Sequence, residues 1–208
     1  MPDEPKPTGR EPQMSDSDRS GLEPHLGGEQ RRRSGPPILL RFVAQVAGRA
    51  DMDYRLEDPR SNRMLASLKK ARECGETFAP RSQTVTVQGQ PFQFETTGLS
   101  ARLDGPQTSW HIDYVRSLST VSRLEWALRD AEGLPLGVMR LNRPMAWLEL
   151  VLADSKRLCK TTTVPHRGGI AEIIFRTDWL APGLEPLFFI AALFGLAMGG
   201  EAAPPQGA

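Results

Sequence analysis

The sequence predicts a mainly β protein, a closed antiparallel β-barrel around a central hydrophobic C-terminal α-helix. Short apolar segments of period two, separated by turn residues, recur from Ile38 onward as four hairpin-like units. Few convincing helical stripes lie between these units. The last long apolar segment, 184–198, is hydrophobic on every side, so something must surround it. A meander that closes on itself can do so.

The length of 208 residues suits one domain with tails. Residues 1–37 are rich in proline and charge and almost lack large apolar side chains, so we expect a disordered tail. The barrel with its helix is expected over 38–200, and a flexible tail over 201–208. The stretch PDEPKP resembles a PxxP ligand for a protein partner, although a plain solvated tail explains it equally simply.

Composition excludes several classes of protein. Lys and Arg total 26 against 25 Asp and Glu, and this net charge of +1 gives no general attraction to nucleic acid, which we do not expect as a partner. Cys74 and Cys159 belong to no CxxC motif or Cys/His cluster, which favours a reduced, cytoplasmic location. The polar N-terminus lacks the apolar region of a signal peptide.

The strands can be assigned in order along the chain. ILLRFVAQV, 38–46, is ambiguous between strand and helix and is assigned as the first strand. The hairpins are expected at 53–70 with a turn at 58–62, at 84–96 with a turn at Gly89, at 124–141 with a turn at 130–133, and at 147–164 with a turn at 154–155. Gly133 would permit a positive φ, and Pro135 suggests an irregular start to its strand. TSWHIDYV, 108–115, is a further strand.

The apolar segment 184–198 is too short to span a bilayer comfortably. A helix rises about 1.5 Å per residue, so it reaches roughly 22 Å against the about 30 Å of a hydrocarbon core. A helix running through the barrel would use Gly195 where the barrel is narrow and Phe188, Phe189 and Phe194 where it is wide. A short tail anchor and a partner-binding helix are the alternatives.

The segment IAEIIFRTDWLAPGLEPLFFIAALFGLAM, 170–198, joins an alternating strand to a hydrophobic helix through an Asp-bearing connection. Together with the hairpin LRDAEGLPLGVMR, 128–140, it resembles the tubby-like superfamily, which includes the phospholipid scramblases and the LURP-one-related proteins. The resemblance covers about 38–200 as a pattern. It implies a twelve-stranded barrel around a central helix, and work at a membrane surface rather than catalysis.

Two features of scramblases have no counterpart in this sequence. Near 176–179 only Asp178 is acidic, whereas calcium requires six to eight oxygen ligands. A cysteine cluster for palmitoylation is also missing. The sequence therefore gives no support for calcium dependence, and we expect no metal site and no cofactor.

Two basic clusters are candidate contact sites for lipid headgroups or a partner. Both fall near expected turns, where a barrel commonly places binding residues. The alternative is that they are solvated charges that keep strand edges from pairing. The clusters are Lys69, Lys70 and Arg72, and Lys156, Arg157 and Lys160.

His111 and Asp113 would share one face of the 108–115 strand and could form an acid/base or metal pair, although a surface-facing polar pair is the simpler interpretation. The sequence contains no GxSxG, Walker-type loop or GxGxxG in a strand-to-helix context. We therefore expect no enzyme and no catalytic residue. The leading hypothesis is a noncatalytic binding module for anionic lipid headgroups or a protein partner, cytoplasmic and peripheral to a membrane. The alternatives are a scramblase-type protein with an inserted helix, and an enzyme using His111 and Asp113.

Overall fold

We describe the protein from a computed structural model. The structure describes residues 37–47, 51–71, 78–115, 123–142, 147–161 and 170–199. All of them belong to one compact unit, Arg33–Ala208. Apart from Pro37, the tails expected at 1–37 and 201–208 lie outside the described residues.

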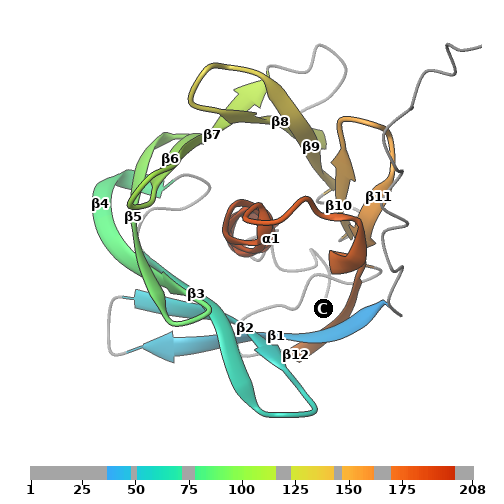
Figure 1. Cartoon of the computed structure of the whole chain (residues 1–208). Coiled ribbons are helices and arrows are strands. Elements are labelled where there is room, and N and C mark those ends of the chain that lie inside the picture. Colours follow the sequence, from blue (N-terminus) through green and yellow to red (C-terminus); the bar gives the residue numbers. More distant parts are fainter. Residues whose placement is uncertain are drawn as a thin grey trace, which may run out of the picture. The chain divides into compact units, whose positions relative to one another are not determined.

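Twelve antiparallel strands form a closed barrel in which each strand pairs with the next in sequence and β12 pairs with β1 (Figure 1). The predicted fold class is confirmed. The strands are β1 (Ile38–Ala47), β2 (Asp51–Asp58), β3 (Arg63–Ala71), β4 (Phe78–Val87), β5 (Gln90–Gly98), β6 (Ser100–Asp104), β7 (Ser109–Val115), β8 (Arg123–Asp130), β9 (Pro135–Asn142), β10 (Trp147–Leu152), β11 (Arg157–Lys160) and β12 (Ile170–Phe175).

Alternation along each strand decides which side chains enter the barrel. In β8, Leu124, Trp126 and Leu128 are buried while the residues between them are only partly covered. Two successive side chains of a strand point to opposite faces, so this pattern gives one apolar face and one polar face. The sequence periodicity therefore assigned the inward residues of β8 correctly. In β9 the predicted apolar alternation of Leu134, Leu136 and Val138 was wrong by one residue, because Met139 and Leu141 are buried and Leu134 is exposed.

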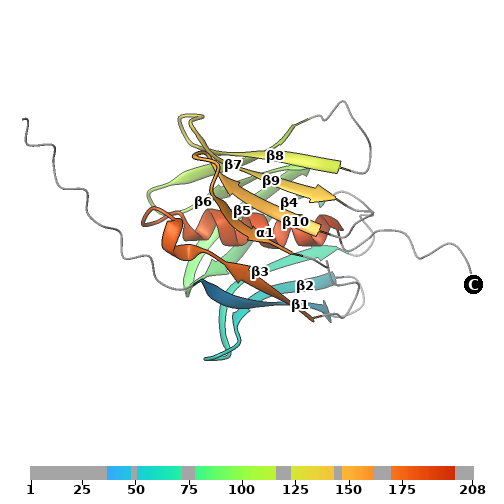
Figure 2. The ribbon, with the colours of Figure 1, turned by 90° about the vertical axis from the view of Figure 1, so that its right-hand side faces the viewer.

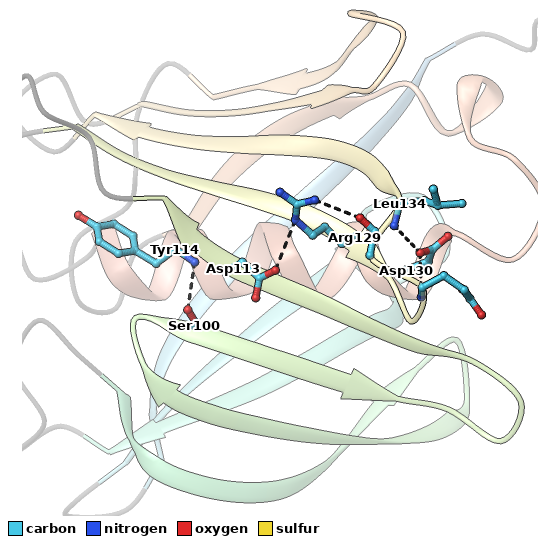
Figure 3. Close-up of polar contacts among 8 residues, drawn as sticks. Ser100, Asp113, Tyr114, Arg129, Asp130 and Leu134 are labelled. Atoms are coloured by element: carbon cyan, nitrogen blue, oxygen red, sulfur yellow. Dashed lines mark hydrogen bonds and ion pairs between the residues drawn. The ribbon is translucent and has the colours of Figure 1, made fainter.

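The hairpin turns predicted from the sequence are present. Gly133 has φ +83°, as the turn between β8 and β9 requires. The Asp130 carboxylate accepts hydrogen bonds from the amides of Glu132 (3.1 Å) and Leu134 (2.8 Å), which fixes the turn locally (Figure 3). Gly89 has φ +86° in the β4–β5 turn.

The helix α1 (Glu185–Gly199) runs through the barrel (Figures 1 and 2). It begins and ends one residue later than the expected 184–198. Every residue from Leu187 to Gly199 is buried. Phe194 packs edge-on against Phe94 and Trp126, with ring centroids 6.0 and 5.9 Å apart. No helix within the described residues has the length and apolarity needed to cross a membrane.

The barrel has a weakly paired seam between β3 and β4. Their ladder contains one described backbone pair, Ala66 with Val87. Farther along the seam, the Gln83 carboxamide accepts from the Lys69 amide (3.3 Å) and donates to the Lys69 carbonyl (2.9 Å). The Gln83 side chain thus pairs with the Lys69 amide and carbonyl in place of the backbone of β4. These backbone groups would otherwise lack partners where the two strands separate.

Two glycines allow the sheet and the helix to approach one another. A Cβ at Gly195 of α1 would lie 2.6 Å from both Leu148 Cδ1 and Met139 Sδ. A Cβ at Gly137 of β9 would lie 2.5 Å from the backbone oxygen of Val151 and 3.2 Å from the Phe188 ring. Gly195 therefore has the role that the sequence suggested, and Gly137 makes room for Phe188.

The two glycines should differ in their tolerance of alanine. Gly137→Ala meets a backbone carbonyl that cannot rotate away, so we expect a loss of unfolding free energy of about 3 kcal/mol or more. Gly195→Ala meets flexible side-chain tips and gains helix propensity, so its loss should be about 1 kcal/mol. Urea unfolding of both variants measures the difference, and an equal or reversed order would contradict the packing described.

Candidate functional site on the outer face

A hollow of about 380 Å³ opens on the outer face of β8, β9 and β10. Its lining combines four charged residues and one tryptophan from the outward side of three neighbouring strands with two leucines of the core. The lining residues are Arg123, Leu124, Glu125, Arg140, Leu141, Trp147 and Glu149.

Arg140 lies at the centre of the hollow between two carboxylates. The register places it opposite Glu125 of β8 on one side and Glu149 of β10 on the other. Its Nε lies 2.9 Å from Glu125 Oε2, and its Nη1 lies 3.8 Å from Glu149 Oε2. The arrangement holds the guanidinium in one orientation and leaves it 46% exposed.

Glu149 connects the hollow to β11. Its carboxylate is nearly buried, and Oε1 lies 2.6 Å from Arg157 Nε. A buried carboxylate requires such partners, since an unpaired charge there would be costly. Arg140 of β9 and Arg157 of β11 therefore both hold the Glu149 side chain in position between their strands.

Trp147 and two further cations form the edge of the hollow at one end of the barrel. Lys160 Nζ lies 5.1 Å from the centroid of the Trp147 ring, within range of a cation–π contact. Arg123, at the start of β8, is exposed and forms no ion pair within the described part of the chain. Arg123 is thus available to an external anion.

The expected cluster of Lys156, Arg157 and Lys160 is only partly brought together with this hollow. Arg157 and Lys160 flank it through Glu149 and Trp147. Lys156 instead lies in the β10–β11 turn, where its Nζ is 2.8 Å from Asp154 Oδ2. That side-chain hydrogen bond lowers the pKa of the Asp154 carboxyl.

The second expected cluster lies on another part of the barrel and includes a residue wrongly placed at the surface. β3 is separated from β11 by β2, β1 and β12. Lys69 is exposed, and Arg72 lies outside the described residues. Lys70 is only 1% exposed, and its Nζ donates to the carbonyl oxygen of Ala197 at 3.3 Å.

The position of Lys70 follows from strand alternation. Ala66, Leu68 and Lys70 all face α1, and the ammonium meets the last turn of the helix, where carbonyls lack partners within the helix. Lys70 is therefore removed from the candidate surface residues and assigned to the C-terminal end of α1. A cation at this end is also favoured by the helix dipole.

His111 and Asp113 lie on the outer face of β7, but their neighbours are cationic. Asp113 Oδ2 lies 3.6 Å from Arg129 Nε, and Arg129 Nη1 donates to the Gly133 carbonyl at 3.0 Å (Figure 3). His111 is paired in register with Arg102 and Arg129. The geometry thus provides an ion pair for Asp113, as expected of a surface-facing polar pair.

Asp178, in the short 3₁₀ helix η2 (Thr177–Trp179), is held by a guanidinium. Arg176 Nε and Nη2 each lie 3.1 Å from an oxygen of this carboxylate, which lowers the pKa of Asp178. The same guanidinium lies 4.1 Å from the centroid of the Trp179 ring. Within the described ranges, no three His, Cys, Asp or Glu side chains are grouped so as to hold a metal ion.

Sequence reasoning did not identify Arg123, Arg140 and Trp147 as parts of one site. Each was visible as an outward or flanking position of a predicted strand. Their convergence depends on the pairing register of β8, β9 and β10. The only local signal was the alternation that placed Glu125 and Glu149 on the polar faces of their strands.

A scan against protein-family models and searches of curated proteins and solved structures found no match to this chain.

The two neighbouring lysines of β3 provide a matched test of the buried cation. Lys70→Met keeps the length of the side chain but leaves the Ala197 carbonyl without this donor, so we expect a loss of about 1–3 kcal/mol of unfolding free energy. Lys69→Met, on the exposed face, should change stability by no more than about 0.5 kcal/mol. Denaturant unfolding measures both, and equal stabilities would contradict a role for the Lys70 ammonium.

Proposed function

We propose that this chain is a noncatalytic binding domain of the tubby-like type that recognises the phosphate of an anionic lipid headgroup on its outer face. The site is the hollow over β8–β10. The observation that carries this proposal is a hollow lined by Arg123, Arg140 and Trp147, with Lys160 Nζ 5.1 Å from the centroid of the Trp147 ring. Three cations of this kind can surround one phosphate.

The carboxylates of the hollow support binding by orienting its cations. Glu125 and Glu149 hold Arg140 in place, so less side-chain entropy is lost when an anion binds. Arg157 also pairs with the Glu149 carboxylate and offsets its negative charge. Arg123 and Lys160 have no carboxylate partner among the described residues. The local balance is therefore cationic although the whole chain is nearly neutral.

The position of α1 favours this function over the scramblase-type alternative. Inserting α1 into a bilayer would require it to leave the barrel, where Leu187–Gly199 is buried. The inward side chains of the barrel would then lose their contacts with α1. Exposing each large apolar side chain to water would cost about 1.5–3 kcal/mol of free energy. We accordingly propose that the protein attaches to the cytoplasmic surface of a membrane without inserting α1 into the bilayer.

Vesicle flotation tests the proposal. The full chain should bind phosphatidylcholine vesicles that contain phosphatidylserine and should not bind phosphatidylcholine alone. Each basic residue near an anionic surface contributes about 1 kcal/mol, so the double variant Arg123→Gln, Lys160→Gln should bind about 30-fold more weakly. Arg140 is left intact because its loss would leave Glu125 without its ion-pair partner and Glu149 with Arg157 alone.

A control double variant, Lys69→Gln with Lys156→Gln, removes the same charge from exposed positions outside the hollow. It should retain most of the binding, and a loss equal to that of the first variant would disprove the hollow as the site. Calorimetric titration with glycerol phosphate provides a second arm. Binding of this soluble ester without binding to vesicles would overturn the lipid assignment in favour of a free phosphate compound.

A further inference from the structure

The outer face of β12 and β1 carries the largest exposed aliphatic side chains of the described sheet. Ile170 is 64% exposed and Ile174 is 59% exposed. Both belong to β12, whose alternate residues Ile173 and Phe175 are in the core. The two isoleucines project from the same face of β12 on either side of Glu172, and exposed aliphatic side chains grouped on one sheet face can mark an interaction surface.

The register arranges this face in three rows. Leu39 of β1 is paired with Ile174, Arg41 with Glu172, and Val43 with Ile170. Two aliphatic rows therefore flank one row of opposite charges. Leu39 is half-buried and Val43 is buried, so the two isoleucines supply most of the exposed apolar area.

The central charges have no partners within the described part of the chain. Neither Arg41 nor Glu172 forms an ion pair or a side-chain hydrogen bond there. Some outward charges of the barrel form ion pairs, such as Arg140 with Glu125 and Arg102 with Asp104, whereas Lys69 and Glu95, like Arg41 and Glu172, have none among the described residues. Arg41 thus lies between Glu172 of β12 and Glu57 of β2 in the register, and the described residues form no ion pair with any of the three.

We infer that this face binds a second copy of the same chain. A two-fold axis parallel to the strands would place β1 of one copy over β12 of the other. Each Arg41 would then oppose the Glu172 of its partner, and each Ile174 would oppose a Leu39. An isologous contact requires this kind of self-complementarity, in which two different residues meet twice.

The charge pattern favours a second copy over an anionic membrane as the occupant. Glu172 lies between the two exposed isoleucines and would be repelled by acidic headgroups. A second copy converts the same carboxylate into an ion pair. The outer surface of a barrel is convex and the face is narrow, so the dimer should be weak and concentration-dependent.

Charge exchange provides a sharp test by sedimentation velocity of the full chain over a concentration series. The wild-type chain should show a reversible monomer–dimer equilibrium. Arg41→Glu makes the central row wholly acidic and Glu172→Arg makes it wholly basic, so each variant alone should dimerise at least about tenfold more weakly. A mixture of the two variants should restore association, because each acidic row then faces a basic one.

A matched control is Glu95→Arg, an equal charge change at an exposed position of β5. It should dimerise like the wild type, and Ile174→Ser should weaken association without changing the affinity of each chain for glycerol phosphate. A chain that stays monomeric throughout, or variants that associate like the wild type, would overturn the inference. Neither result would affect the lipid proposal, because no residue of β12 or β1 lines the hollow.

Discussion

The rest of the structure depends on the enclosure of one helix that has no polar side. From Leu187 to Gly199 every residue of α1 is buried, so the sheet must close around it completely. Closure fixes the face of each strand, because alternate side chains have to meet the helix. It also demands local fitting, with Phe194 among the aromatic rings of β5 and β8 and Gly195 against Leu148.

The same alternation places polar residues on the outside, where several of the described charges neutralise one another. Glu149 is held by two arginines, and Asp178 by Arg176. Such pairs are weak individually when exposed, but they occupy cations that would otherwise attract ligands. The proposed contacts with lipid and with a second copy use charges that are not neutralised in this way. Arg123 and the pair Arg41 and Glu172 are charges for which the described residues supply no ion-pair partner.

More of the fold than of the candidate site could be predicted from the sequence, because the fold has local signals and the site depends on strand register. Period-two alternation, Gly133 in its turn and the all-apolar helix are local signals, and each corresponds to an observed element. Lys70 shows the limit, because a lysine beside a turn usually stays in solvent, whereas this one meets the last turn of α1, far away in sequence. Arg123 and Trp147 came together only through strand register, which no short segment specifies.

The hollow and the proposed dimer face are connected by the direction of the strands. Arg123 begins β8 and Trp147 begins β10, so both lie at the barrel end where α1 finishes. A two-fold axis parallel to the strands leaves that end facing the same way in both copies. Two weak phosphate sites would then meet one membrane plane together, and the second binding event would become intramolecular. Dimerisation through β12 and β1 would in this way strengthen attachment to anionic lipid without adding any contact to the hollow itself.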